Sequence, residues 1–198
     1  MIKRLCLTFL ICMFAYSVNA QTWTSSDYGT HYTKDSLEIR ERIIDCMQKY
    51  SVKSVSRRQL ANILDLSAME AVKLDLELPT MLAIIATETN FKPYAVSCAG
   101  AKHGRGLMQV SEIALLDYNK SNGTKYAPKD LFDIEINIRI GFWVYLQNAK
   151  YGLNKYDTIR MVSAYNMGIS SVKRGKINYK YVNKVIAFKN EYFSCWDK

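Results

Sequence analysis

Apolar residues recur along most of this chain at the three- and four-residue spacing of an amphipathic helix. The clearest stripes are Ile43, Ile44, Met47 and Tyr50; Met81, Leu82, Ile84 and Ile85; Ile136, Ile140 and Trp143; and Tyr181, Val182, Val185, Ile186 and Tyr192. No run shows the sustained two-residue alternation that a half-buried strand would need. The pattern therefore predicts an all-α protein built as a single helical domain.

Helix starts are marked by residues that cap free backbone N–H groups. Three pairs have the spacing of a capping box and predict helix starts there: Asp35 with Glu38, Ser56 with Gln59, and Ser67 with Glu70. Pro79 suits the first turn of a helix that runs to about Thr89. Further helices are expected after the caps Ser111 and Asp157, and from about Ile134 to Tyr151.

The segment from Pro93 to Arg105 interrupts this helical pattern and predicts a loop. It contains Gly100 and Gly104 together with the basic run Lys102-His103-Gly104-Arg105. Later stops are expected at Ser121-Asn122-Gly123, at Gly152 and at Gly168, since these residues tolerate the left-handed conformation that ends helices.

The first twenty residues resemble a signal peptide. Lys3 and Arg4 precede an uncharged, mostly apolar run from Leu5 to Val18, which is shorter than the roughly 20 residues of a membrane span. Val18-Asn19-Ala20 suits cleavage before Gln21, although an uncleaved anchor stays open. We expect residues 1–20 to be removed, residues 21–34 to form a polar arm and residues 35–198 to form the folded domain. The protein would then be exported to the periplasm, cell wall or outside, without stable membrane insertion.

The chain is basic, with 27 Lys and Arg against 18 Asp and Glu and a formal net charge of +9. Removing Lys3 and Arg4 with the signal peptide leaves an excess of basic residues, which suits an anionic partner. The bacterial wall, with its peptide carboxylates and phosphate polymers, is one such partner and nucleic acid is another. Export argues against nucleic acid, and no recognition motif for it is present.

Three cysteines follow the expected cleavage site: Cys46, Cys98 and Cys195. In an oxidising compartment an odd number suggests one disulfide and one free thiol. Cys46 and Cys195 lie near opposite ends of the mature chain, so their pairing would join the terminal helices and leave Cys98 free. The other pairings stay open at this point.

Glu88 is the first candidate for chemistry. It follows Ile84 by four positions and Ile85 by three, so it emerges on the apolar face of its helix. Burial disfavours the charged form of a carboxyl group and raises its pKa, which suits a general acid at neutral pH. The alternative is that Thr87, Glu88 and Thr89 are simply the polar end of a helix.

The residues around Glu88 carry a family resemblance. The run Glu88-Thr89-Asn90-Phe91-Lys92-Pro93-Tyr94-Ala95-Val96-Ser97, followed by Gly100-Ala101 and Gly106-Leu107-Met108-Gln109, resembles the signature of the soluble lytic transglycosylase family. Three later blocks, Asp130 to Gly141, Ala164 to Gly168 and Tyr181 to Val185, are similar to that family's pattern. The resemblance covers about residues 68–188 and implies a lysozyme-like fold, shared with goose-type lysozymes.

The blocks suggest substrate contacts beside Glu88. We expect Gln109 to donate to and accept from sugar hydroxyls and acetamides, and Met108 to form an adaptable apolar wall. Tyr165 would hydrogen-bond near Glu88 or the glycosidic oxygen, and Asn166 would hold the helix end and the groove wall. By resemblance, Ser97 would hold the N-acetyl group or the attacking hydroxyl. Core packing is the alternative for Met108, and a plain helix turn is the alternative for Tyr165 and Asn166.

The chain departs from the family pattern in two places. Thr89 replaces the usual Ser but keeps a hydroxyl group. Eight residues, Cys98 to Arg105, separate Ser97 from Gly106, about three more than the common pattern, so Lys102 to Arg105 form an extra basic loop that we expect to bind the wall. Some members linked to secretion machines have an Asp where this chain has Gly104. His103 is expected to be a loop histidine, and no ligand spacing predicts a metal or other cofactor.

Glu88 is the one inward-facing acid near the motif, whereas ordinary glycosidases use two carboxylates. Glu112, Asp133 and Glu135 are expected to be helix-start residues. The resemblance implies that Glu88 first protonates the oxygen between N-acetylmuramic acid and N-acetylglucosamine in peptidoglycan glycan strands. It would then deprotonate the muramoyl C6 hydroxyl, which closes a 1,6-anhydro ring.

Two other functions stay open: a hydrolytic muramidase of the same fold, and a non-catalytic wall-binding assembly factor. The sequence also leaves open the setting, which is wall recycling, a phage, or a wall-spanning secretion or conjugation apparatus.

Overall fold

The computed structural model describes residues 34–97 and 103–196. Helices make up this part of the chain: α2 (Lys34–Tyr50), α3 (Arg57–Leu74), α4 (Leu78–Thr89), α5 (Glu112–Asn122), the 3-10 helix η2 (Pro128–Phe132), α6 (Ile134–Lys150), α7 (Thr158–Met167), α8 (Ile169–Lys173) and α9 (Tyr179–Trp196). Within those ranges no strand forms, and extended pairing is limited to two isolated bridges that join Val96, Arg105 and Val110. The expected all-α, lysozyme-like fold is confirmed.

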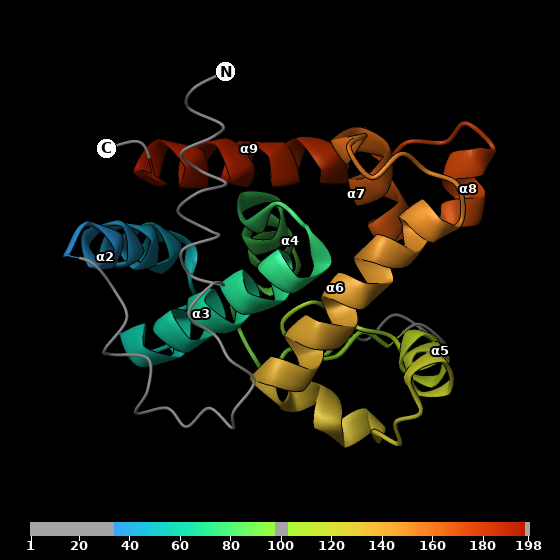
Figure 1. Cartoon of the computed structure of the whole chain (residues 1–198), viewed down its shortest axis with the longest axis horizontal. Coiled ribbons are helices and arrows are strands. Elements are labelled where there is room, and N and C mark those ends of the chain that lie inside the picture. Colours follow the sequence, from blue (N-terminus) through green and yellow to red (C-terminus); the bar gives the residue numbers. More distant parts are fainter. Residues whose placement is uncertain (1–33, 98–102, 197–198) are drawn as a thin grey trace.

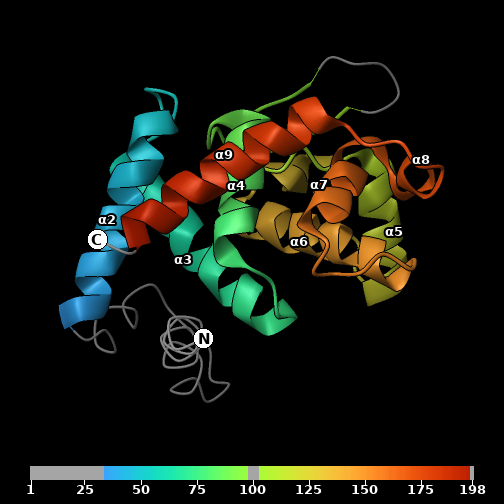
Figure 2. The same ribbon diagram turned by 90° about the horizontal axis from the view of Figure 1, so that it is seen from above.

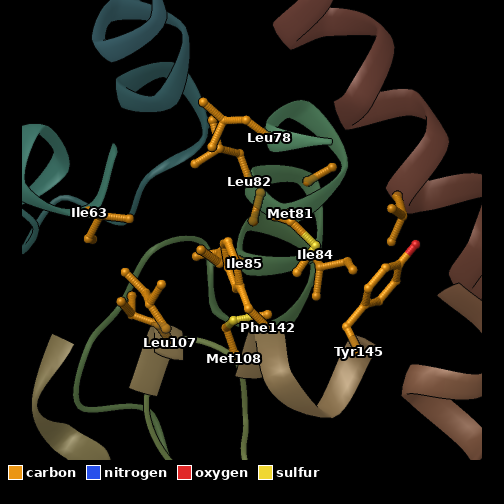
Figure 3. Close-up of a cluster of buried hydrophobic side chains, with 14 of the residues drawn as sticks. Ile63, Leu78, Met81, Leu82, Ile84, Ile85, Leu107, Met108, Phe142 and Tyr145 are labelled. Carbon is orange, nitrogen blue, oxygen red and sulfur yellow. The ribbon is translucent and has the colours of Figure 1, made fainter. Parts of the chain in front are cut away.

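The helix α4 forms the centre of the molecule, and its sequence explains why. Every residue from Leu78 to Ala86 is buried, because this helix is apolar on all sides and has no face for solvent. The longer helix α9 runs across α4, and α3 packs on another side of it (Figures 1 and 2). Figure 3 shows Met81 and Ile85 of α4 directed toward Phe142 of α6 and Met108 of the preceding loop.

Most predicted helix starts are confirmed by hydrogen bonds at the caps. Ser56 and Gln59 form the complete capping box that opens α3. The side chains of Ser111, Asp133 and Asp157 each accept a hydrogen bond from the backbone N–H three positions later, at 3.2, 2.9 and 3.0 Å. These bonds fix the first turns of α5, α6 and α7.

The predicted helix start at Ser67 is wrong. Ser67 lies inside α3, which continues without a break to Leu74. Its side chain is fully buried in a stripe with Leu60, Ile63, Leu64 and Ala71, so burial of one continuous face outweighs the local capping signature. At the other end of the chain, α2 begins at Lys34, so Asp35 stands inside its first turn and does not precede it.

The expected disulfide between Cys46 and Cys195 is present. It joins α2 to α9 across 149 positions of sequence, with a Cα–Cα distance of 6.6 Å. Cys98, the predicted signal peptide and nearly all of the predicted polar arm lie outside the described residues. In the part of the chain that the structure describes, no helix combines the length and apolar character that a membrane span requires.

Candidate active site

Glu88 stands in the last turn of α4, partly buried, and is held by a residue of α9. The phenol of Tyr181 donates a hydrogen bond of 2.5 Å to Glu88 Oε1. Burial raises the pKa of Glu88 above the ordinary value of 4.5, against the opposing effects of this hydrogen bond and of the positive charge of Lys184. The carboxyl group therefore has the environment of a general acid, as the sequence predicted.

The second polar neighbour of Glu88 also comes from α9. Lys184 lies three positions after Tyr181, on the same side of the helix. Its ammonium group donates a 3.2 Å hydrogen bond to the carbonyl oxygen of Thr87, one residue before Glu88. Tyr181 and Lys184 both favour the carboxylate form of Glu88, while burial favours the protonated form. The sequence pattern put Tyr181 in the apolar stripe of the last helix and in the last family block, but it indicated no role for the Tyr181 hydroxyl or for Lys184.

Tyr165 does lie near Glu88, but it bonds elsewhere. Its phenol donates a hydrogen bond of 2.6 Å to the carbonyl oxygen of Met108. Burial, with a further contribution from the negative charge of Glu88, raises the pKa of Tyr165 well above 10. The phenol therefore stays protonated and fixes the loop after Gly106. The hydrogen bond to Glu88 comes from Tyr181 and not from Tyr165.

The expectation that Met108 forms an apolar wall for sugar is not supported by its position. Its side chain is completely buried beside Phe142 and Gly141 (Figure 3), where a Cβ atom on Gly141 would collide with the Met108 sulfur. The alternative of core packing is therefore correct. Met108 acts in the site through its backbone, since its carbonyl oxygen accepts from Tyr165 and its N–H donates to Asn137 Oδ1 at 2.8 Å.

Asn137 is the residue that organises the Gly106-Leu107-Met108-Gln109 loop. Besides accepting from the Met108 N–H, its amide nitrogen donates to the carbonyl oxygens of Arg105 at 2.8 Å and Leu131 at 2.7 Å. Gly106 is required here because a Cβ atom would collide with Asn137 and with the Leu131 carbonyl, and because its φ is +73°. A polar Asn inside an apolar helix stripe was the sequence signal for the role of Asn137.

Gln109 points its amide nitrogen into the protein. It donates to the carbonyl oxygen of Ala95 at 3.2 Å and to that of Gly106 at 2.9 Å. Both amide hydrogens are therefore occupied, and the expectation that Gln109 also donates to sugar is corrected to an acceptor role through Oε1. Gly104 packs tightly on Gln109, since a Cβ there would stand 2.8 Å from the Gln109 Cβ and 2.9 Å from Oε1.

Ser97 closes the base of the long loop. Its hydroxyl oxygen accepts a 2.9 Å hydrogen bond from the Gly104 N–H, and its own N–H donates to the Gly104 carbonyl at 3.1 Å. His103 Nδ1 lies 3.0 Å from the Ser97 carbonyl oxygen, which agrees with the expected role as a loop histidine. Lys102 falls outside the described residues.

Arg105 is not a free cation of this loop, which corrects the expectation that it contributes directly to wall binding. Its side chain is 20% exposed and forms a 2.7 Å ion pair with Glu112 in the first turn of α5. Its backbone also pairs with Val110, with N–H···O distances of 3.0 and 3.1 Å. Arg105 therefore holds the two ends of the Gly106–Gln109 turn together and neutralises its own charge in doing so.

Thr89 keeps the hydroxyl function of the Ser that the family pattern has at this position. It is buried and donates a 2.9 Å hydrogen bond to the Leu107 carbonyl, with the Ile85 carbonyl at 3.2 Å. This bond links the end of α4 to the loop that carries Met108 and Gln109.

Asn166 contacts the residue that precedes α9. Its Oδ1 accepts a 2.8 Å hydrogen bond from the amide nitrogen of Asn178. The Asn178 N–H donates to the hydroxyl of Ser163 at 2.9 Å, and its Oδ1 accepts from the Tyr181 N–H at 3.2 Å. Asn166 therefore positions, through Asn178, the turn that carries Tyr181.

Glu88 is the carboxyl group of the site, and burial raises its pKa. Glu112, Asp133 and Glu135 occupy first turns or caps, as expected. Within residues 34–97 and 103–196 no group of three or more His, Cys, Asp or Glu side chains could hold a metal ion.

The described part of the chain is an all-helical domain in which a partly buried carboxyl group, Glu88, accepts a hydrogen bond from a phenol and has an ammonium group nearby. The family model described as "Transglycosylase SLT domain" matches residues 65–187, and the chain belongs to this family. The chain is 28% identical over 179 residues to "Membrane-bound lytic murein transglycosylase C" of Yersinia pestis (strain Pestoides F) and of Yersinia pseudotuberculosis serotype O:1b (strain IP 31758). Each match covers 85% of this chain and 49% of the relative, so the chain spans about half the length of these relatives.

Proposed function

We propose that this protein is a peptidoglycan lytic transglycosylase that cleaves the bond between N-acetylmuramic acid and N-acetylglucosamine and forms a 1,6-anhydro ring. The observation that carries the proposal is the environment of Glu88, a partly buried carboxyl group with raised pKa that accepts a hydrogen bond from Tyr181. Membership of the transglycosylase family and the murein transglycosylase relatives support it.

The first step uses the protonated form of Glu88. Burial keeps the proton on the carboxyl group at a higher pH than in water, so the group donates it to the glycosidic oxygen as the C1–O bond breaks. Glu88 then becomes a carboxylate, which is the form that Tyr181 and Lys184 stabilise.

The second step uses that carboxylate. Glu88 removes the proton from the muramoyl C6 hydroxyl, and the oxygen forms a bond to C1. The proton balance closes, because Glu88 ends the cycle protonated and no water is consumed. One carboxyl group suffices for both steps, and the other acids near the motif, Glu112, Asp133 and Glu135, occupy helix caps or first turns.

We propose that the remaining polar groups orient the sugar. Gln109 Oε1 accepts from a hydroxyl or acetamide N–H, and the Ser97 hydroxyl at the loop base contacts the N-acetyl group or the C6 hydroxyl. Tyr165, Asn166 and the Met108 backbone act by holding the loop and the start of α9 in place.

The test is the product formed by wild type and by Glu88→Gln on purified wall. Glu88→Gln should abolish turnover, because each of the two proton transfers is typically worth roughly 10²–10⁴-fold. Glu38→Gln, on the exposed side of α2, is the matched control and should keep full activity. Mass spectrometry of the wild-type products should find muropeptides one water lighter than hydrolytic products. Reducing N-acetylmuramic acid ends would show a hydrolytic muramidase instead, and full activity of Glu88→Gln would refute the site.

We further propose that residues 1–20 direct export to the periplasm and that residues 35–198 form the catalytic domain. N-terminal sequencing of exported protein should begin at Gln21, and retention of Met1 would refute cleavage. A role in opening the wall for a secretion or conjugation apparatus is a proposal of the same kind. It requires that deletion of the gene blocks assembly of that apparatus while bulk wall turnover continues.

A further inference from the structure

The chain has an uninterrupted basic region next to the site. From residue 158 to residue 190 it contains no Asp or Glu, and within this stretch five cations occur in twelve positions: Lys173, Arg174, Lys176, Lys180 and Lys184. The stretch runs from the start of α7 through α8 and into α9, and its five cations fall between the last residue of α8 and the first third of α9. The helices α7 and α8 and the start of α9 lie together in Figures 1 and 2.

These five side chains are exposed, and within the described part of the chain no ion pair joins Lys173, Arg174, Lys176 or Lys180 to an acid. Lys184 differs from these four, because it bonds the Thr87 carbonyl and its charge acts on Glu88. Several cations elsewhere are paired: Arg57 contacts both Glu41 and Asp45, Arg40 pairs with Asp65 at 2.8 Å, and Lys189, further along α9, pairs with Glu77. Lys173, Arg174, Lys176 and Lys180 are therefore clustered without a neutralising acid, and like charges so close together repel one another.

The last cation of the basic stretch, Lys184, lies beside Glu88. Lys184 donates to the carbonyl oxygen beside Glu88, and Lys180 lies one helical turn before Lys184 on the same side of α9. A strand whose glycosidic oxygen reaches Glu88 therefore lies close to the start of α9, which contacts Glu88 and Thr87 through Tyr181 and Lys184. Anionic groups attached to that strand are then within reach of the flexible side chains of Lys176 and Lys180.

We propose that Lys173, Arg174, Lys176 and Lys180, the basic segment, bind the carboxylates of the stem peptides carried by the glycan strand. The proposal rests on the proposed function and names its substrate more closely as peptide-bearing, rather than bare, strands. Peptide carboxylates fit better than wall phosphate polymers, because the peptides are attached to the muramic acid residues themselves. They therefore recur beside every bond that Glu88 can cleave.

The test measures binding, which does not depend on turnover. The basic-segment variant carries Lys173→Gln, Arg174→Gln and Lys176→Gln together with Glu88→Gln, which prevents turnover. This protein is sedimented with wall sacculi that carry no phosphate polymer. The sacculi are used intact or with their carboxylates converted to amides. The matched control is Lys49→Gln/Lys53→Gln/Arg58→Gln in the same background, which removes the same charge from exposed, unpaired positions on α2, α3 and the turn between them.

The control protein should bind intact sacculi about tenfold more tightly than amidated sacculi at low salt, as three exposed charge contacts allow. The basic-segment variant should bind both forms with the weak affinity that the control has for amidated sacculi. Equal binding by the two variants, or equal binding of intact and amidated wall by the control, would overturn the proposal. A variant that loses affinity only for wall carrying phosphate polymers would identify that polymer as the partner and overturn it as well.

Failure of the proposed function would look different. In that case wild-type protein would release no anhydromuropeptide from either form of sacculus, whatever the binding preference. The variant's fold is checked by its thermal unfolding, which should match that of the control because all six replaced residues are exposed.

Discussion

Tyr181→Phe is the most informative single change, because it removes one hydroxyl and leaves the ring that packs on the core. In the wild type that hydroxyl donates at 2.5 Å to Glu88 Oε1. A hydrogen bond to a charged group is worth roughly 1.5–3 kcal/mol. The transition state of the acid step places negative charge on Glu88, so its loss should lower the rate constant for turnover by about 10- to 150-fold.

The pH dependence separates this effect from simple damage to the site. The hydrogen bond favours the carboxylate and holds the pKa of Glu88 below the value that burial alone would give. Without it the pKa of Glu88 rises further. Since the first step needs the protonated form, the alkaline limb of the rate profile should move to higher pH while the plateau falls.

The assay follows release of anhydromuropeptides from sacculi between about pH 4 and pH 9, with Tyr179→Phe as the control. Tyr179 lies two positions earlier on α9 and is 62% exposed, so its hydroxyl should matter to neither the plateau nor the limb. A lower plateau without any shift of the alkaline limb would refute the role assigned to the hydrogen bond. A shift of the alkaline limb toward lower pH would show that loss of the hydrogen bond lowers the pKa of Glu88, which is the opposite of the predicted direction.

Three further predictions concern stability. Replacing both Cys46 and Cys195 with Ala should lower the free energy of unfolding by about 5 kcal/mol in the chain-entropy model, given the 149-residue separation, while activity at 25 °C persists. Urea unfolding measures the loss of stability, and an unchanged unfolding midpoint would contradict the prediction. Asn137→Leu should cost about 2–5 kcal/mol, because it removes the hydrogen bonds that Asn137 makes to the Met108 N–H and the Leu131 carbonyl and one of the two bonds to the Arg105 carbonyl, and a loss below 1 kcal/mol would argue against a central role. Because burial raises the pKa of Glu88 above 4.5, this group's contribution to stability is full below about pH 4.5 and is lost as the pH rises through the folded pKa. Glu88→Gln should therefore raise Tm relative to wild type at pH 7 more than at pH 4, and equal gains at both would exclude the ionisation as the cause.

The fold was predictable because helical periodicity and capping are local properties of the sequence. The caps at Ser56, Ser111 and Asp157 act between residues three positions apart, and the structure contains each of them. The failure at Ser67 has the same origin. Its spacing to Glu70 is that of a capping box, but only tertiary packing decides that this turn is buried inside a longer helix.

The site was predictable only where one residue's own neighbours determine its environment. Glu88 could be identified because Ile84 and Ile85 place it on a buried face. Tyr181 could not, since its hydrogen bond depends on how α9 crosses α4, and 93 positions separate the two residues. For Gln109, the occupation of its amide hydrogens by the carbonyl oxygens of Ala95 and Gly106 follows from the loop's tertiary path, which its neighbours in sequence do not reveal.

The two ends of α9 are fixed separately, and this arrangement explains how a site formed from distant segments keeps its geometry. At the C-terminal end the disulfide to Cys46 joins α9 to α2. At the N-terminal end Asn178 holds the helix to Ser163 and Asn166 of α7, one turn before Tyr181. The phenol that contacts Glu88 depends on the second attachment, because a shift of a single ångström at that turn would break a 2.5 Å hydrogen bond. The disulfide therefore stabilises the fold, whereas Asn166 and Asn178 set the position of the phenol that, in the proposed mechanism, stabilises the Glu88 carboxylate between the two proton transfers.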